Sequence, residues 1–286
     1  MLTLGRRTFA DSDLLVMAIV NRTRDSFHEG GATFDEEPAL DRVRSVVAAG
    51  ADIVDIGGVK AGPGEHVDAA EEVRRTVPLV ARVRELFPDI VVSVDTWRAE
   101  VAREACDAGA DLLNDAWGGF DPDLARVAAE RGVGLVCSHS NGAVPRTAPA
   151  RPTYDDVVAA AIGSTVALAE RAVTLGVDRD SVLIDPAHDF DKTTPHSLEL
   201  TRRLDEMVAT GWPVLVALSR KDFVGETLDR PVAGRLLGTL AATAVSAWQG
   251  ARVFRAHDVA ETREVLDMVA SIRGTRPPTR AVRGFD

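Results

Sequence analysis

The chain has 286 residues and a formal net charge of −11, from 44 acidic and 33 basic side chains. A negative balance of this size argues against a general electrostatic attraction to nucleic acid or to an anionic membrane, because both are polyanions. Hydrophobic residues make up 45% of the chain, which suits one large α/β domain, a class in which single barrels commonly exceed roughly 200 residues.

The beginning of the chain does not predict a targeting or membrane segment. Residues 1–13 lead into an apolar run at 14–20 that is seven residues long, too short for a signal-peptide core or a membrane span. The two cysteines, Cys106 and Cys137, lie in apolar stretches without CxxC or metal-type spacing. We therefore expect reduced core thiols and a cytoplasmic protein.

Eight short runs of aliphatic and β-branched residues recur along the chain, each followed by a segment of helical period. The predicted strands are 14–20, 52–58, 91–96, 112–115, 134–139, 182–186, 213–219 and 252–257. Runs such as VVSVD and VLVALS are apolar without a period of two, as expected of parallel strands that are covered on both faces. Eight strand–helix units in one chain predict a (β/α)₈ TIM barrel.

Amphipathic stretches rich in Ala and Arg separate the strands, for example 38–49 and 69–87. Most end in a glycine of the kind that terminates helices: Gly50, Gly109, Gly132, Gly176, Gly211 and Gly250. We expect a single barrel domain over 1–273. The tail 274–286 has no core pattern and is interpreted as a solvated terminus.

Polar residues stand where the predicted strands end, and in a barrel these ends meet at one face, where active sites form. They are Asn21, Asp55, Asp95, Asn114, Asp115, His139, Asp185, Ser219, Arg220, Lys221, Arg255 and His257. Any one of them could be a buried residue bonded to backbone, but the whole set favours a ligand site. The longest loops on the same face are 21–37, 58–67 and 140–152.

The basic residues add to this interpretation. The chain has only three lysines, Lys60, Lys192 and Lys221, and all fall in predicted strand-to-helix loops. Five of the six histidines are expected on the same face: His28, His66, His139, His188 and His257.

Four cations follow the last two strands, where barrels commonly hold phosphate: Arg220, Lys221, Arg255 and His257. The alternative is ion pairing with neighbours such as Asp222 and Asp258. The segment GGVKAGPGE has neither the P-loop nor the dinucleotide spacing, so nucleotide hydrolysis is unsupported.

Seven motifs in order, each at a strand end, resemble the dihydropteroate synthase family. They are MAIVNRTRDSFHEGG, DIVDIGG, SVDT, NDAWGG, LIDPAHDFDK, ALSRKDF and RAHDV. The resemblance implies a pterin-binding barrel that condenses a dihydropterin methyl diphosphate with p-aminobenzoate and releases diphosphate, as in folate biosynthesis. It also implies magnesium (Mg²⁺) as cofactor and a homodimer, for which the predicted helices 232–248 and 259–272 are candidates.

The resemblance carries roles to matching positions. Pterin binding is implied for Asp95, Asn114, Asp185, Lys221 and Arg255. Diphosphate binding is implied for Asn21, Arg255 and His257, with magnesium at Asn21 arriving with the diphosphate; we add Lys60 as a hypothesis. Contact with the second substrate is implied for Phe190 and Ser219. Catalytic roles are expected for Asp25, as counter-charge to a pterin cation, and for Lys221 and Arg255.

Departures from the family concentrate in three loops. The family's Thr-Pro-Asp is Thr23-Arg24-Asp25 here, and its Asp-Pro-Gly-Ile-Gly-Phe-Gly-Lys is the segment 185–192. Its Gly-Gly-Glu-Ser-Thr-Arg-Pro-Gly is the segment 57–64, which lacks the Thr and Arg that close over aminobenzoate and diphosphate. Lys60 or Arg24 is our candidate to replace that arginine in part.

These departures leave several interpretations open. The first is an active dihydropteroate synthase-like transferase with altered loops. The second is a divergent paralogue that binds pterin or sulfa-like ligands with little or no turnover. A methyltetrahydrofolate-dependent methyltransferase is a third, against which NRTRDSF and SRKDF argue. An aldolase-type barrel with Lys221 as Schiff-base lysine is a fourth.

Overall fold

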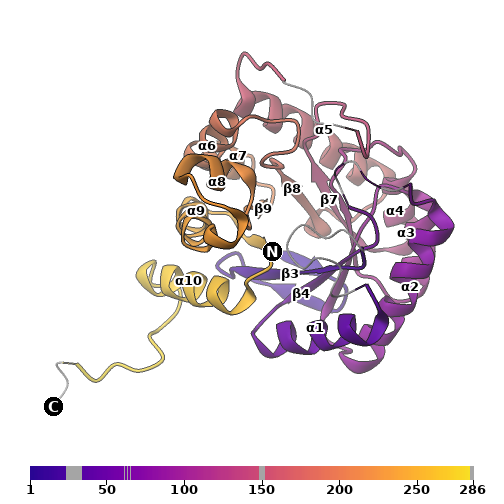
Figure 1. Cartoon of the computed structure of the whole chain (residues 1–286), viewed down its shortest axis with the longest axis horizontal. Helices are drawn as coiled ribbons and strands as arrows, with labels where there is room; N and C mark the ends of the chain where they lie inside the picture. The colour runs from indigo at the N-terminus through magenta and orange to yellow at the C-terminus, as the bar shows by residue number, and fades with distance from the viewer. Residues whose placement is uncertain (24–33, 61, 63, 65, 148–151, 284–286) are drawn as a thin grey trace.

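The computed structural model describes residues 1–23, 34–60, 62, 64, 66–147 and 152–283 and shows a barrel of parallel strands surrounded by helices (Figure 1). The barrel strands are β3 (Leu15–Asn21), β4 (Ile53–Gly57), β5 (Val91–Asp95), β6 (Leu112–Asp115), β7 (Gly134–Ser138), β8 (Val182–Asp185), β9 (Leu215–Ala217) and β10 (Val253–Ala256). Their order is β8-β7-β6-β5-β4-β3-β10-β9. A parallel bridge between Ile184 and Val214 joins the two ends, which confirms the predicted barrel.

Helices follow the strands and cover the outside of the barrel (Figure 1). They are α1 (Glu36–Ala48), α2 (Ala69–Leu86), α3 (Ala99–Asp107), α4 (Leu124–Arg131), α5 (Val157–Leu175), α6 (Thr194–Arg202), α7 (Leu204–Val208), α8 (Asp222–Leu228), α9 (Leu236–Gln249) and α10 (Val259–Ile272), with 3₁₀ turns η1 (Arg179–Ser181) and η2 (Val232–Gly234). All six glycines predicted to end helices have positive φ angles, from 65° at Gly132 to 110° at Gly109. This conformation strains residues that carry a Cβ, which explains glycine at these positions.

The strands bury both of their faces. In β3, Val16 and Ala18 belong to the core between strands and helices, whereas Leu15 and Met17 belong to a second core inside the barrel. The same division runs through β4, where Val54 faces the helices and Ile53 the interior. Burial on both sides is why the predicted strands showed no alternation of apolar and polar residues.

An antiparallel hairpin of β1 (Leu2–Leu4) and β2 (Arg7–Phe9), which the sequence did not lead us to expect, begins the chain. Leu2, Leu4 and Phe9 pack into the inner core with the first residues of the barrel strands, such as Leu15 and Val91. The hairpin therefore closes the end of the barrel that lies opposite the strands' carboxyl ends.

Two further features bear on location and shape. Among the described helices, α5 alone is long and apolar enough to cross a membrane by length and composition; here it packs against β7 and β8 as a barrel helix. Beyond α10, residues 274–283 are largely exposed and leave the barrel as an extended tail (Figure 1).

Candidate functional site

A cavity of about 730 Å³ opens at the carboxyl ends of the barrel strands. Of the eleven residues to which a ligand or catalytic role was given, ten line it: Asn21, Lys60, Asp95, Asn114, Asp185, Phe190, Ser219, Lys221, Arg255 and His257. The eleventh, Asp25, lies outside the described residues, as do Arg24 and His28. Four other predicted strand-end residues do not line the cavity: Asp55, Asp115, His139 and Arg220. The topology of the barrel thus gathers side chains from strands far apart in sequence around one space large enough for a small molecule.

Arg255 is held deep in this cavity by two carboxylates. From β10 it donates to the Oδ2 of Asp55 on β4 at 2.6 Å and to the Oδ2 of Asp95 on β5 at 2.9 Å. Asp55 is fully buried and also accepts from Ser93 Oγ at 2.6 Å and Asn114 Nδ2 at 3.2 Å. The pair Asp55–Ser93 therefore positions Arg255 and Asn114 without lining the cavity, and Ser93 was not among the predicted site residues.

Asp95, the carboxyl group of this network that lines the cavity, has a raised pKa. Burial raises the pKa of Asp95 to about 7, because the favourable charge of Arg255 is outweighed by desolvation and by the nearby carboxylate of Asp55. A carboxyl group that titrates near neutrality can change between hydrogen-bond donor and acceptor at physiological pH.

Asp185 and Lys221 lie on the other side of the cavity. Asp185 ends β8, and its Oδ1 accepts from the backbone N of Ala187 at 2.7 Å. Lys221 donates to the backbone O of His188, and its Nζ lies 5.0 Å from the centre of the Phe190 ring. Burial lowers the pKa of the Lys221 ammonium and raises that of the Asp185 carboxyl. The two groups can offer one donor and one acceptor edge to a planar ligand.

Two of the expected residues on this face support the loop rather than the cavity. Lys192 is buried and donates to the carbonyls of His139 at 3.2 Å and Phe190 at 2.8 Å. His188 is fully buried, and its Nε2 lies 3.1 Å from the Oγ1 of Thr201. Neither Lys192 nor His188 is among the residues that line the cavity.

The cations after β9 and β10 divide into two groups. Arg220 forms a bidentate ion pair with Asp258, at 2.8 Å for both contacts, so the ion-pair alternative holds for this residue. His257 faces the cavity, where its backbone N and its Nδ1 lie 3.1 and 3.0 Å from the Oγ of Ser219. The phosphate-type cations that line the cavity are therefore Lys221, Arg255 and His257.

Loops after β4 and β7 form the outer wall. Val59, Lys60 and Gly62 line the cavity from the first loop, and residues 140–144 and 147 from the second. The two loops touch, because Arg146 Nη1 donates to the backbone O of Lys60 at 2.6 Å. The length of the loop after β7 predicted that it belongs to the ligand-binding face, but no sequence motif identified which of its residues line the cavity.

Comparisons with known proteins agree with this geometry. A family model described as pterin binding enzyme matches residues 17–257. The chain is 59% identical to the inactive dihydropteroate synthase 2 of Mycobacterium leprae, over 98% of each chain, and 35% identical to the dihydropteroate synthase of Haemophilus influenzae, over 88% of this chain and 91% of that one.

Solved structures give the same result. The dihydropteroate synthase of Yersinia pestis in complex with a sulfonamide drug superposes with a TM-score of 0.89 at 34% identity, covering 96% of this chain and 99% of that chain. The fold is thus shared along nearly the whole length of the chain. The chain belongs to the pterin-binding enzymes and, among them, to the dihydropteroate synthase family.

Proposed function

We propose that this protein is a dihydropteroate synthase paralogue that binds a dihydropterin methyl diphosphate in the deep half of its cavity and couples it only slowly to p-aminobenzoate. The observation that supports this most directly is the convergence of Asp95, Asn114, Asp185, Lys221 and Arg255 on one cavity. The outer loops, by contrast, have lost the family's Thr and Arg over segment 57–64.

The deep residues suit a flat heterocycle with both donors and acceptors on its edge. Ionised Asp95 and Asp185 accept from ring amine and N–H groups, and Lys221 and the Asn114 amide donate to ring oxygen or nitrogen. Arg255 is fixed by Asp55 and Asp95, so its guanidinium is presented to the ring in one orientation without further ordering on binding.

The diphosphate is assigned to Arg255 and His257 together with Asn21. All three line the cavity, and Lys60 lines it from the loop after β4. We propose that Lys60 supplies part of the charge that the family's loop arginine provides. Donors placed where the leaving oxygens gain charge lower the barrier to breaking the carbon–oxygen bond. The arylamine nitrogen forms the new carbon–nitrogen bond and loses a proton, so no protein nucleophile is required.

The residues at the mouth fit magnesium only as an ion that arrives with its ligand. Within the described ranges there is no group of three or more His, Cys, Asp or Glu side chains that could hold a metal. Asn21 would hold the ion through its amide oxygen, together with oxygens of the bound diphosphate and water, which are ligands of the kind that Mg²⁺ prefers. When bound, the ion neutralises charge on the leaving diphosphate.

A single reaction mixture tests the proposed function. The purified protein is incubated with dihydropterin diphosphate, Mg²⁺ and p-aminobenzoate, while diphosphate release and dihydropteroate are followed together, the latter by mass. We expect saturable pterin binding and product at a rate well below that of the Haemophilus influenzae enzyme measured in parallel. Absence of pterin binding overturns the proposal; diphosphate release without product identifies pterin activation with another acceptor.

Pterin affinity should depend on pH through Asp95. Its pKa of about 7 means that the acceptor form is lost as the pH falls, so affinity for a dihydropterin without diphosphate should rise about tenfold from pH 6 to pH 8. Calorimetric titration across this range measures it. The variant Asp95→Asn should bind more weakly with a flat profile; a flat profile in the unmodified protein contradicts the assignment.

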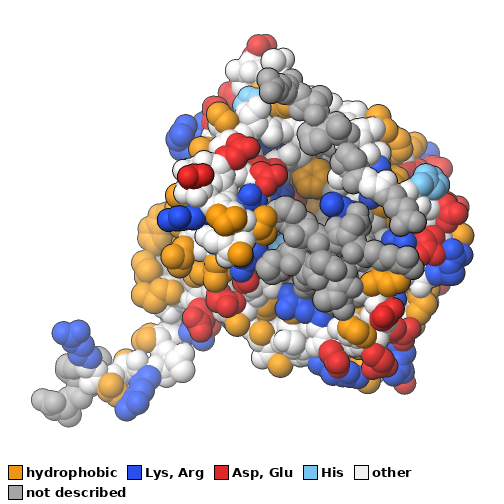
Figure 2. All heavy atoms as spheres, in the orientation of Figure 1, with side chains coloured by type: hydrophobic (Ala, Val, Ile, Leu, Met, Phe, Trp, Pro, Cys, Tyr) orange, Lys and Arg blue, Asp and Glu red, His pale blue; other side chains and the backbone are white. Residues whose placement is uncertain are grey.

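We further propose a homodimer in the cytoplasm. Leu237, Val245, Trp248, Met268 and Ile272 of α9 and α10 are large apolar side chains that are exposed, and apolar side chains cluster over α9 in Figure 2. Surfaces of this kind are typical of contacts between subunits. Sedimentation at micromolar concentration tests the dimer.

The proposed cytoplasmic location is supported by the cysteines. Cys106 and Cys137 are both free thiols, which suits a reducing compartment.

A further inference from the structure

The loop after β8 holds three non-glycine residues in the left-handed region. Ala187, Asp189 and Asp191 have φ angles of 53°, 66° and 50°, a conformation that favours glycine. By the resemblance described above, these are the three positions at which the family has glycine. The backbone path is therefore that of a glycine-rich loop, but side chains, two of them carboxylates, have been added on either side of Phe190.

The two added carboxylates have different surroundings. Asp189 also lines the cavity, but its carboxylate is bonded to neighbouring helices, because its Oδ2 accepts from the backbone N of Phe223 at 3.1 Å and its Oδ1 from Ser197 Oγ at 2.9 Å. Asp191 instead meets the loop after β7, where its Oδ2 accepts from Asn141 Nδ2 at 2.9 Å. Asp191 and Asn141 both line the outer cavity beside Phe190.

The charge of Asp191 is only partly balanced. Asp222, another carboxylate on this wall, pairs with Arg235 at 2.7 Å, and Asp191 bonds to the neutral amide of Asn141. The nearby Lys192 interacts with Asp191 electrostatically, but burial lowers the pKa of Lys192 to about 7. Lys192 also already donates to two carbonyls.

We propose that Asp191 determines the class of second ligand: it disfavours an arylamine that carries an anionic group, such as p-aminobenzoate, and favours a neutral or cationic one. The inference depends on the proposed function for the identity of the deep ligand. The reason is electrostatic, because a carboxylate brought beside Phe190 meets Asp191 in a partly desolvated cavity, where like charges repel more strongly than in water.

Three ligands with the same ring separate charge from shape: p-aminobenzoate, p-aminobenzamide and p-aminobenzamidine, with charges of about −1, 0 and +1 at neutral pH. Each is titrated into the full chain saturated with dihydropterin. We expect p-aminobenzoate to bind most weakly. Asp191→Asn should strengthen its binding about three- to tenfold and weaken that of the amidine by a similar factor, with both changes reduced at high salt.

A matched control is available in Asp229→Asn, because Asp229 is also left-handed, with φ of 51°, but is exposed at the end of α8 and away from the cavity. It should leave all three affinities unchanged. If Asp191→Asn does not fold, Asp191→Gly removes the same charge at a position whose backbone suits glycine.

An unchanged affinity ratio in the Asp191 variants, tightest binding of p-aminobenzoate by the unmodified protein, or no binding of any arylamine overturns the inference. Saturation with dihydropterin is measured first in the same samples. Failure of that step overturns the proposed function instead, so the two outcomes are distinguishable.

Discussion

Replacing Arg255 with leucine should destabilise the fold by about 3–5 kcal/mol at neutral pH and remove measurable pterin binding. The reason is that Asp55, which is fully buried, and Asp95 both depend on this guanidinium for charge compensation. Removing one member of a buried ion pair leaves an unpaired charge in a poorly solvated site. Urea unfolding and dihydropterin titration measure the two effects.

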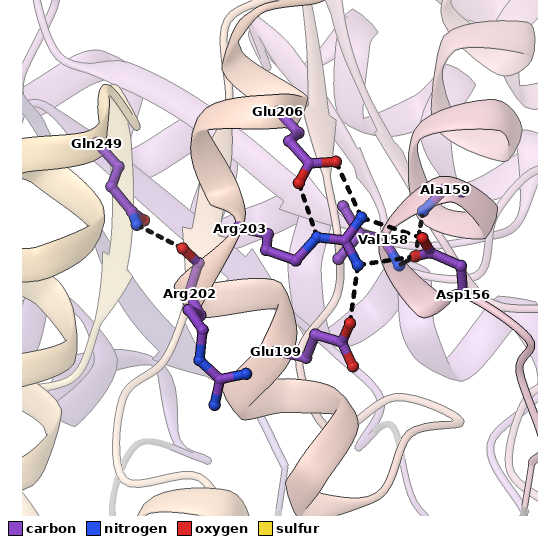
Figure 3. A network of polar contacts seen from close by, with 8 residues as sticks. All are labelled: Asp156, Val158, Ala159, Glu199, Arg202, Arg203, Glu206 and Gln249. Carbon is purple, nitrogen blue, oxygen red and sulfur yellow. Dashed lines mark hydrogen bonds and ion pairs between the residues drawn. The ribbon is translucent and has the colours of Figure 1, made fainter.

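Arg203 provides the matched control for this variant. It too contacts several carboxylates, Asp156 at 3.0 Å, Glu199 at 2.8 Å and Glu206 at 2.7 Å, and Figure 3 shows these converging on its guanidinium. These partners are well exposed, with 38–47% of their side-chain surface accessible, so water replaces the lost contacts. Arg203→Leu should therefore lose far less stability and keep pterin binding. Equal losses in the two variants would show that burial is not what makes Arg255 important.

The deficit of the Arg255→Leu protein should also depend on pH with a definite sign. Without the cation, the folded-state pKa of Asp95, which burial already raises to about 7, lies further above the unfolded value of about 3.9. The folded state then binds more protons than the unfolded state, so stability falls as pH rises through this interval. The loss measured at pH 5 should be smaller than the loss measured at pH 8.

The strand-end residues could be predicted because the architecture of the fold follows from its strands. Once eight parallel strands are recognised, their carboxyl ends must meet, and the cavity lined by Asp95, Asn114, Asp185 and Arg255 follows. The direction in which each of these side chains points could not be predicted in the same way. Arg220 stands between Ser219 and Lys221, and only the outer two line the cavity, since adjacent side chains turn in different directions and Arg220 pairs with Asp258.

Features that depend on partners distant in the chain were the ones missed. No feature of the neighbouring sequence identifies Ser93 as the residue that donates a hydrogen bond to Asp55. That contact arises because β4 and β5 are adjacent strands whose register places Ser93 opposite Asp55. The hairpin of β1 and β2 was missed for a similar reason: its apolar residues are few, and they become informative only when the open end of the barrel is known. The site roles themselves stay predictions until ligands are tested.

Restoring the family's loop arginine should increase turnover. Gly62, the position of that arginine, lines the cavity, has no positive φ, and a Cβ placed there would have no atom within 4 Å. A Cβ can therefore be added at position 62 without a steric clash, which permits Gly62→Arg combined with Ala61→Thr to restore the neighbouring threonine. One charge-assisted contact to a leaving group contributes on the order of 2–4 kcal/mol in the transition state, so dihydropteroate formation should rise about 100-fold.

The control is Gly163→Arg, an equal change of charge at an exposed position of α5 where a Cβ also meets open space; it should leave the rate unchanged. Lys60→Ala in the otherwise unmodified chain should lower both the rate and the affinity for inorganic diphosphate with Mg²⁺, because we assign Lys60 part of the arginine's role. Unchanged values for Lys60→Ala would remove it from the diphosphate site. If Gly62→Arg with Ala61→Thr binds diphosphate more tightly but gains no rate with p-aminobenzoate, the slow turnover that we propose is due to the acceptor wall around Asp191. The combined variant with Asp191→Gly should then show the gain.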